Sequence, residues 1–273
     1  MDFDRAFTER TPRIVAAKKL HRASARRKAQ AFLVEGENCV DAAIGTGAAR
    51  DIFVTEAGAQ RSAELLQAAD LMGIPTHPIT EKAARQLADT VHSPGIFAVC
   101  EPVLWSLGSC LRGQPRLLSV PVETNEPGNA GTMIRVADAM GADAVVFAGD
   151  TCDPLSSKAA RSSAGSLFHL PVVRNRDIDA VIERLSNSGL TLLATAADGE
   201  VNLDEAEELL AQPTAWLFGN EAHGLSTELQ ERADHRVRIP ITGRAESLNL
   251  ATASAICLYE SARAQRRAGT ARA

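Results

Sequence analysis

The chain has 273 residues, a mass of 29.0 kDa and 45% hydrophobic residues, enough for one large domain or two ordinary ones. Its formal net charge of -5 argues against a uniformly basic coat for nucleic acid, and its five cysteines form no CxxC pair, which argues against a disulfide framework or a zinc knuckle. No apolar run approaches the ~20 residues needed to cross a bilayer, so we expect a soluble protein of the reducing cytoplasm.

The N-terminal region contains a basic segment. Residues 13–28 carry seven lysines and arginines and no acidic residue. On one continuous helix, Lys18, Arg22 and Arg26 would align as a cationic stripe that can follow a phosphate backbone and bind RNA. A solvated helix face is the alternative, and this segment alone does not decide between the two.

Short apolar runs separated by segments of helical composition follow the basic segment. They lie at residues 32–34, 52–54 and 96–99. These runs predict the strands of a small α/β domain, which we place at residues 1–102. Prolines and glycines without clear periodicity then predict an interdomain linker at residues 103–115.

The remainder, residues 116–273, alternates between strands and helices. Strands are predicted at residues 117–122, 144–148, 190–194, 215–218 and 237–239, with a helix near Ala159 and a last helix from about residue 248 to 265. Alternation of this kind predicts an α/β domain with a parallel sheet that is covered on both faces.

Three segments of this domain share one design, in which a buried strand runs through a turn rich in glycine or proline into a helix. They are residues 125–135, 216–226 and 237–250. In the first, free backbone N–H groups and Arg135 at the carboxyl edge of the sheet would suit an anionic ligand. In the third, Ser247 can cap the final helix and Asn249 lies in its first turn. Each segment alone has a structural reading as a turn or a cap, but three together indicate a site.

The joint pattern resembles the SpoU/TrmH group of RNA ribose 2′-O-methyltransferases, within the SPOUT superfamily. The matching motifs are Asn129-Ala130-Gly131-Thr132 with Arg135, Phe218-Gly219-Asn220-Glu221 with Gly224-Leu225, and Ile239-Pro240 with Glu246-Ser247-Leu248-Asn249. They extend from about Arg116 to Glu260. The run Phe32-Leu33-Val34-Glu35-Gly36 has a looser similarity to the small ribosomal-protein-like domain with which many members hold RNA.

The resemblance implies a knotted α/β domain, closed by a deep trefoil knot, that acts as a homodimer on RNA with S-adenosylmethionine as cofactor. Ribosomal RNA is the favoured substrate. The implied cofactor contacts are Thr195, Gly219, Ile239 and Leu248, and the implied catalytic cluster is Asn129, Arg135, Glu221, Ser247 and Asn249. Glycine at position 219 fits this role because a side chain would keep a ligand from the backbone.

The implied chemistry moves a methyl group from a sulfonium to a hydroxyl, which requires the oxygen, the methyl carbon and the sulfur to lie close to a line. A guanidinium is effectively always protonated, so we interpret Arg135 as a clamp rather than a base. It would grip the phosphate and stabilise charge on the 2′-oxygen, while Ser247 or a bound water relays the proton. We interpret His223, in a variable turn position, as a bystander.

Other classes of function have weaker support in the sequence. The third glycine of a dinucleotide fingerprint is missing, and no HExxH helix is present, so neither a nicotinamide enzyme nor a metal site is expected. The alternatives left are a non-catalytic RNA-binding protein that keeps the fold, a regulator that responds to S-adenosylmethionine, and a transfer-RNA 2′-O-methyltransferase. Incubation with labelled cofactor and RNA distinguishes them.

Overall fold

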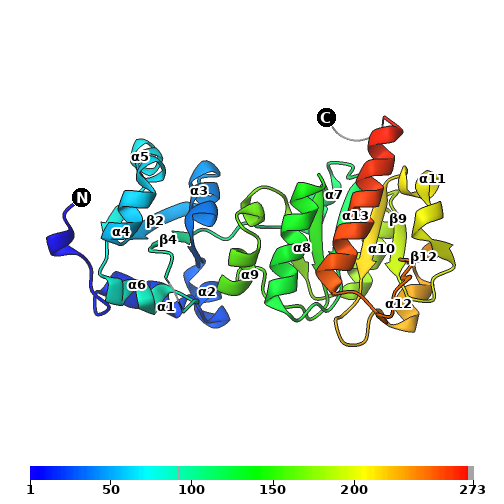
Figure 1. Ribbon diagram of the computed structural model, residues 1–273, viewed down its shortest axis with the longest axis horizontal. Helices are drawn as coiled ribbons and strands as arrows, with labels where there is room; N and C mark the ends of the chain where they lie inside the picture. Colours follow the sequence, from blue (N-terminus) through cyan, green and yellow to red (C-terminus); the bar gives the residue numbers. More distant parts are fainter. Residues whose placement is uncertain (92, 270–273) are drawn as a thin grey trace. The chain divides into compact units, whose positions relative to one another are not determined.

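The computed structural model describes residues 1–91 and 93–269, and the chain divides into two compact units (Figure 1). Unit 1 consists of Met1–Val103 together with Asp153–His169. Unit 2 consists of Leu104–Cys152 and the chain from Leu170 onward. The chain therefore passes from one unit to the other three times.

Unit 1 is built around a four-stranded sheet with the order β1-β4-β2-β3. The strands are β1 (Phe32–Glu35), β2 (Ala49–Val54), β3 (Thr76–Pro78) and β4 (Ile96–Cys100). β4 pairs antiparallel with β1 and β2, whereas β2 and β3 are parallel. The three predicted strands of this region are thus β1, β2 and β4, and β3 adds an edge.

Helices cover both faces of this sheet. They are α1 (Pro12–Lys19), α2 (Ala23–Ala29), α3 (Glu37–Gly45), α4 (Glu56–Arg61), α5 (Ala63–Leu71), α6 (Glu81–Leu87) and α9 (Ser157–Ser162), with 3-10 turns η1 (Phe3–Arg5) and η2 (Ser166–Phe168). On one face, Ile14 of α1 and Leu87 of α6 pack against Phe53 and Phe97. On the other face, α3 contacts β1 and β4 while α9 contacts β1. Unit 1 therefore has its own apolar core.

The segment Asp153–His169 belongs to unit 1 although it follows a strand of unit 2. Arg161 Nη1 lies 2.7 Å from Glu35 Oε1, and the Glu35 residue is only 4% exposed. The rings of Phe168 and Phe32 stack with centroids 5.9 Å apart. A buried carboxylate needs a charged or hydrogen-bonding partner, and this segment supplies one from a distant part of the sequence.

Unit 2 is built around an eight-stranded sheet with the order β10-β12-β9-β11-β6-β7-β8-β5. The strands are β5 (Leu104–Trp105), β6 (Leu117–Pro121), β7 (Ala144–Ala148), β8 (Val172–Asn175), β9 (Thr191–Thr195), β10 (Val201–Asn202), β11 (Thr214–Phe218) and β12 (His235–Arg238). Every neighbouring pair is parallel. The predicted parallel α/β architecture is confirmed.

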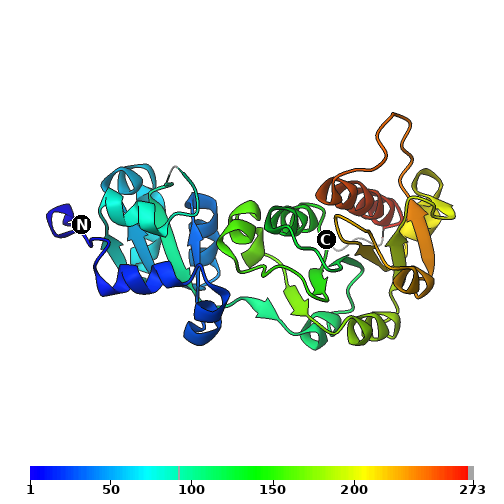
Figure 2. The ribbon, with the colours of Figure 1, turned by 90° about the horizontal axis from the view of Figure 1, so that it is seen from below.

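Helices cover both faces of this sheet as well (Figure 2). They are α7 (Leu107–Leu111), α8 (Pro127–Ala139), α10 (Ile178–Ser186), α11 (Glu207–Leu210), α12 (Thr227–Glu231) and α13 (Leu250–Arg267), with a 3-10 turn η3 (Leu203–Glu205). α8 and α13 pack on each other and on β6, whereas α7 and α10 contribute to the core on the opposite face. None of the helices in the described residues is long and apolar enough to span a membrane.

The strand order brings distant turns together. β11 lies between β6 and β9, and β12 lies beside β9, so four strands from three parts of the sequence end along one stretch of the sheet edge. A crevice at the carboxyl ends of parallel strands, where the order of connection changes, is a general place for ligand sites. β5 and α7 are ordered parts of unit 2 within residues 103–115, for which the sequence predicts a linker.

Candidate functional site

The turn after β11 folds back on itself at Gly219. A Cβ added at this residue would lie 2.2 Å from the carbonyl carbon of Gly224, closer than atoms can approach. Asn220 and Gly224 exchange backbone hydrogen bonds of 3.1 and 2.9 Å. Glycine is therefore required at position 219 by the close approach of the backbone at Gly224, in addition to the approach of a ligand that the sequence suggests.

A cavity of about 710 Å³ opens beside this turn, at the carboxyl ends of β9, β11 and β12. Its lining residues come from all three predicted motif segments, from the end of β9 and from the first turn of α13: Glu126, Asn129, Thr195, Ala196, Ala197, Gly219, Asn220, Glu221, Ala222, Gly224, Val237, Ile239, Ile241, Glu246, Ser247, Leu248, Asn249, Leu250 and Ala253. All four residues that the resemblance implies as cofactor contacts are among them. So are four of the five that it implies as the catalytic cluster.

Three of these residues form a chain of hydrogen bonds that joins the three segments. Asn129 Nδ2 donates to Glu221 Oε1 at 3.0 Å, and Asn249 Nδ2 donates to Asn129 Oδ1 at 3.1 Å. The backbone N–H groups of Asn125 and Glu126 also donate to the Glu221 carboxylate, each at 3.3 Å. The motifs therefore contact one another directly, although their residues are separated by 92 and 120 positions in the sequence.

These contacts determine the charge of Glu221. Burial by itself raises the pKa of this carboxyl, but the hydrogen bonds from Asn129 and from backbone N–H groups outweigh it, and the pKa lies below its usual value of 4.5. Glu221 is consequently a carboxylate at neutral pH. Glu221 lies on the turn after β11, and its oxygens accept bonds from residues 125–129 after β6, so its first effect is to hold these two segments together.

Asn249, rather than Ser247, is the N-cap of α13. Its Oδ1 accepts hydrogen bonds from the N–H groups of Ala251 at 2.9 Å and Thr252 at 3.3 Å. The prediction that Ser247 caps this helix is wrong, because the helix begins at Leu250, beyond the reach of a residue three positions earlier. Ser247 is exposed and lines the cavity instead.

Arg135 does not line the cavity with the other predicted residues. It lies in the middle of α8, six positions after Asn129, and six residues rotate a side chain by about 240° around a helix. Its side chain is exposed, and no hydrogen bond or ion pair to its guanidinium is found within residues 1–91 and 93–269. The guanidinium is therefore available to a ligand or to another molecule.

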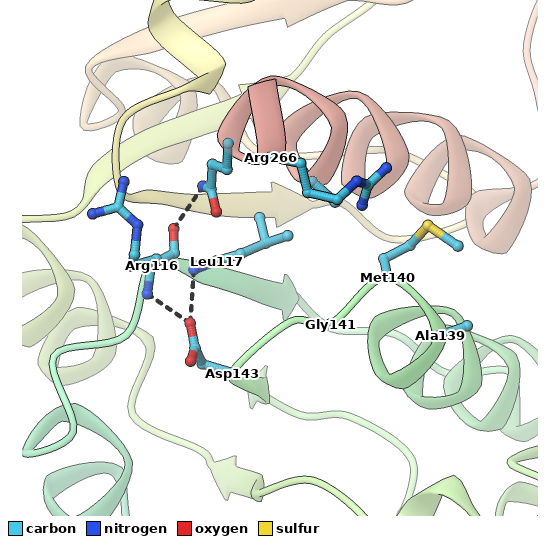
Figure 3. Close-up of a pocket in the computed structure, with 9 residues that line it drawn as sticks. Arg116, Leu117, Ala139, Met140, Gly141, Asp143 and Arg266 are labelled. Atoms are coloured by element: carbon cyan, nitrogen blue, oxygen red, sulfur yellow. Dashed lines mark hydrogen bonds between the residues drawn. The ribbon is translucent and has the colours of Figure 1, made fainter. Parts of the chain in front are cut away.

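A second, smaller cavity of about 260 Å³ lies at the opposite edge of the sheet, where β6 begins (Figure 3). There Asp143 Oδ2 accepts hydrogen bonds from the N–H groups of Arg116 at 2.6 Å and Leu117 at 3.0 Å, and Gln265 donates to the Arg116 carbonyl at 3.1 Å. These bonds fix the start of the strand, and none of the motif residues is present. The larger cavity is the candidate site.

The structure corrects the predicted cationic stripe in unit 1. α1 ends at Lys19 and α2 begins at Ala23, so Lys18, Arg22 and Arg26 do not lie on one continuous helix. Arg26 is only 6% exposed, and its Nε donates to Asp153 Oδ2 at 3.0 Å. Its Nη1 donates to two backbone carbonyls at the end of α1. Lys18 and Arg22 remain exposed.

One residue outside the predicted set, Asn220, is also held in the site by hydrogen bonds of its side chain. Asn220 donates through Nδ2 to the carbonyl of Glu123 at 2.7 Å and accepts through Oδ1 from the N–H of Ala222 at 2.8 Å. Its position in the second motif, directly after Gly219, was a signal that could have found it. No cluster of residues suited to a metal ion is found in the described part of the chain.

Comparisons with known proteins match the N-terminal and the C-terminal parts of the chain to two different family models. A family model described as the SpoU rRNA Methylase family matches residues 116–259, and a model described as the MRM3-like substrate binding domain matches residues 11–98. The 23S rRNA (guanosine(2553)-2'-O)-methyltransferase RlmP of Bacillus subtilis is 35% identical over 244 residues, which cover 89% of this chain and 92% of that protein. A 23S rRNA (uridine(2479)-2'-O)-methyltransferase of Streptomyces viridochromogenes is 34% identical, with 67% and 71% covered.

Solved structures are similar over nearly the whole chain. The SpoU methyltransferase AviRb of Streptomyces viridochromogenes, in complex with the cofactor AdoMet, has a TM-score of 0.80 and 30% identity, with 94% of this chain and 99% of that chain covered. An AdoMet-bound rRNA methyltransferase from Sinorhizobium meliloti has a TM-score of 0.79 and 27% identity, with 93% and 95% covered.

Proposed function

The chain belongs to the SpoU rRNA methylase family, and on that premise we propose that it is an enzyme that transfers a methyl group from S-adenosylmethionine to a ribose 2′-hydroxyl of ribosomal RNA. The observation that carries this proposal is the convergence of three sequence-distant motif segments around one cavity of about 710 Å³. Cavities of roughly 300–1,000 Å³ are typical of small-molecule sites.

The residues around the cavity fit S-adenosylmethionine, which supplies an electrophilic methyl group on a sulfonium when bound. Ile239 and Leu248 offer apolar surface for an adenine ring, and the backbone of Gly219 is uncovered by any side chain of its own. The Thr195 hydroxyl donates to the Leu217 carbonyl at 3.0 Å and keeps its oxygen free to accept. We assign the cofactor contacts to Thr195, Gly219, Ile239 and Leu248.

The five residues of the proposed catalytic cluster divide into two kinds. Asn129 hydrogen-bonds both Glu221 and Asn249, and these two bonds orient the loops on which the cofactor and the ribose rest. Ser247 is exposed at the cavity and makes no such bond, so its hydroxyl is available to relay the proton of the attacking 2′-oxygen. Arg135 supplies the positive charge that grips the adjacent phosphate.

The position of Arg135 supports a homodimer in which this arginine acts on the cavity of the partner subunit. Arg135 is exposed on α8, outside the cavity of its own protomer. The outer surface of the neighbouring helix α13 carries Tyr259, whose exposed fraction of 48% is high for a large ring, and a second copy would cover it.

We also propose that unit 2 contains a deep trefoil knot. Its support is that α13 packs back onto β6 and β11, although β12 lies beyond β9.

The test of the clamp is the variant Arg135→Lys, which keeps the charge but loses the planar fork. Turnover of labelled S-adenosylmethionine on ribosomal RNA should fall about 100-fold or more, as when a preorganised donor is removed from an active site. Arg112→Lys, an exposed arginine beside α7, is the matched control and should keep wild-type turnover. Near-normal turnover of Arg135→Lys would rule the clamp out. Methylation of transfer RNA in place of ribosomal RNA would contradict the proposed substrate.

Action across the dimer has its own test. Arg135→Ala and Ser247→Ala chains, each expected to turn over about 100-fold more slowly than wild type on its own, are co-expressed. If Arg135 serves the partner's cavity, about a quarter of wild-type turnover returns, because half of randomly formed dimers are mixed and each has one complete site. If Arg135 and Ser247 serve the same protomer's cavity, neither site of a mixed dimer is complete, and turnover stays at the level of the single variants. In the second arm, a chain that carries both substitutions is co-expressed with wild type; a mixed dimer then keeps one complete site, and half of the wild-type turnover per dimer, only in the same-protomer case.

We propose that unit 1 holds the RNA, because the substrate binding domain matches residues 11–98. Lys18 and Arg22 are exposed and are the proposed phosphate contacts, while Arg26 keeps the fold of unit 1. Lys18→Glu with Arg22→Glu should weaken RNA binding and flatten its salt dependence, since each lost phosphate contact removes about 0.7–0.9 from the slope. Charge reversal at Arg5, whose side chain is 90% exposed near the N-terminus, is the control.

We also assign the protein to the cytoplasm. All five cysteines lie in the described residues and none of them forms a disulfide, which suits a reducing compartment. Cell fractionation followed by immunodetection tests this assignment, and recovery of the protein in an oxidising compartment would contradict it.

A further inference from the structure

The loop between β6 and α8 is held from two sides. The N–H of Val122 donates to the carbonyl of Phe218 at 2.8 Å, and the N–H of Glu123 donates to the carbonyl of Ala148 at 2.9 Å. These bonds tie the loop to the ends of β11 and β7, the two strands that flank β6. The carbonyl of Glu123 in turn accepts a hydrogen bond from the side chain of Asn220.

Glu123 has an unfavourable backbone conformation. Its φ is +51°, in the left-handed region that side chains other than glycine rarely adopt. The other described non-glycine residues with positive φ are Gln30, Gln114 and Ala164. Glu123 does not line the cavity itself, but its carbonyl accepts a hydrogen bond from Asn220, which does. Such conformations persist where surrounding contacts hold them, and they cluster at functional sites. A specific contact must therefore hold the Glu123 peptide in place.

Asn220 provides that contact. Its Nδ2 donates to the Glu123 carbonyl at 2.7 Å, the shortest of its bonds, and its Oδ1 accepts from the N–H of Ala222 at 2.8 Å. The residue is 9% exposed, and its backbone pairs with Gly224. One amide thus joins the strained loop before α8 to the turn after β11.

The contacts of Glu221 begin directly beside this amide. Glu221 follows Asn220 in the sequence, and the N–H groups that meet its carboxylate belong to Asn125 and Glu126, two and three residues after Glu123. The loop after β6 and the turn after β11 are therefore joined twice, first by the Asn220–Glu123 bond and then, within three residues, by the bonds to the Glu221 carboxylate. A shift at the first contact is passed on to the second with little chain to absorb it.

We propose that Asn220 is a positioning residue for methyl transfer: its amide locks the strained Glu123 peptide to the 220–224 turn and so sets Glu221 and Asn129 at the cavity. This inference rests on the proposed function for its activity readout. The role requires an amide, because the group must donate to one loop and accept from the other at the same time. An aspartate of the same shape would lose the donor and place a second carboxylate next to Glu221.

The main test is Asn220→Asp, compared with Asn187→Asp at an exposed position after α10, at the opposite edge of the sheet. Asn220→Asp should lower kcat about 10- to 100-fold with a smaller change in the KM for RNA, since a misplacement of about 1 Å can cost about 100-fold. Asn187→Asp should turn over as wild type. An unchanged kcat in Asn220→Asp overturns the proposal.

A rescue experiment separates positioning from a general loss of structure. Glycine adopts a positive φ without strain, so Glu123→Gly removes the need for a hold on this peptide. The double variant Asn220→Asp/Glu123→Gly should therefore turn over ~3- to 10-fold faster than Asn220→Asp alone, as expected for coupled neighbours. If the double variant is no faster, or slower by the product of the two single effects, the strained peptide is not what Asn220 holds.

A readout without activity keeps the inference separate from the proposed function. Amide hydrogen exchange at Asn125 and Glu126 should accelerate in Asn220→Asp, while exchange in β7 is unchanged. If Asn220→Asp does not fold, Asn220→Ser takes its place, because the shorter hydroxyl can still accept from Ala222 but does not reach Glu123. If a folded variant exchanges both amides as slowly as wild type, the inference is wrong. If wild type methylates no RNA but the variant still exchanges these amides faster than wild type, only the proposed function is wrong.

Discussion

Two segments line the candidate cavity from the side of the C-terminal strands, and they differ sharply in how they are held. Residues 219–225 make a closed turn, with backbone bonds between Asn220 and Gly224 and a side-chain bond from Ala222 to Asn220. Residues 241–249 are all exposed, and within the described part of the chain no hydrogen bond is found for residues 240–248. Residues 219–225, the closed wall of the cavity, are thus held in place by their own hydrogen bonds. Residues 241–249, the open wall, are anchored to the described residues only at Asn249.

The difference indicates how the two walls act. Segments with few buried contacts and exposed backbone open at low free-energy cost, and ligand-binding loops are drawn from them. Ile241 and Leu248 in the open wall are 39% and 37% exposed, and a bound apolar ring would cover them. We expect residues 219–225 to keep one conformation with or without cofactor, and residues 241–249 to become ordered by it.

The largest contrast should come from one methyl group added to each wall. Gly219→Ala places a Cβ 2.2 Å from the Gly224 backbone, whereas no atom of the described residues lies within 4 Å of a Cβ added at Gly243. Gly219→Ala should lower the free energy of unfolding by about 1–3 kcal/mol or more and abolish cofactor binding, because backbone has to move. Gly243→Ala should stay within about 0.5 kcal/mol. Urea unfolding and calorimetric titration measure both, and equal effects would contradict the comparison.

Ser247 of the open wall should affect turnover without affecting stability. Ser247→Ala removes the proposed proton relay and should reduce kcat about 100-fold, the lower range for general acid–base groups. Since Ser247 is exposed and is not the cap of α13, the free energy of unfolding should change by less than about 0.5 kcal/mol. Turnover within a factor of about two of wild type would assign the relay to water instead.

Cofactor should protect one wall more than the other. With S-adenosylmethionine at ten times its Kd, amide exchange in residues 241–249 should slow about 10-fold, the factor expected when binding requires the closed segment. Residues 219–225 should change less, because their turn is already bonded. Hydrogen exchange with mass spectrometry resolves the two peptides, and similar protection of both would show that the closed turn also opens in the free protein.

The smallest effect should be a pH dependence confined to the closed wall. The pKa of Glu221 is lowered from 4.5 in the folded state, so its carboxylate adds stability that is fully present above pH 4.5 and is lost as the pH falls through the lower folded value. The unfolding free energies of wild type and Glu221→Gln should therefore converge below pH 4.5. In an Asn129→Ala background the difference should shrink, since one donor is gone. A difference that grows on acidification would contradict the sign.

The sequence predicted much of unit 2 because its elements follow local rules. Buried strands are continuous apolar runs, and the turns after them contain the glycines and prolines that end a strand. Three of the four residues predicted to contact the cofactor, Thr195, Gly219 and Ile239, lie at or just after strand ends, so an approximate strand boundary was enough to place them beside the cavity. β8 and α10 were not predicted, and β5 and α7 were taken for linker because their runs are short.

Two predictions failed because each depended on the exact residue at which a helix begins or ends. Ser247 and Asn249 are both good caps, and only the start of α13 at Leu250 decides for Asn249. The cationic stripe failed because a break between Lys19 and Ala23 separates its members and turns Arg26 inward. Spacing by four in the sequence indicates a shared face only if the helix is continuous.

By itself, the sequence determined the strands that are continuous apolar runs, the turns that follow them and the side chains those turns carry, because these properties depend on residues a few positions apart. The tertiary structure alone decided that β11 enters between β6 and β9, so that Glu221 meets Asn129, and that Asp153 returns to bury Arg26. Such pairings are set by the packing of distant apolar faces and by the need of each buried charge for a partner, and neither is written in local spacing.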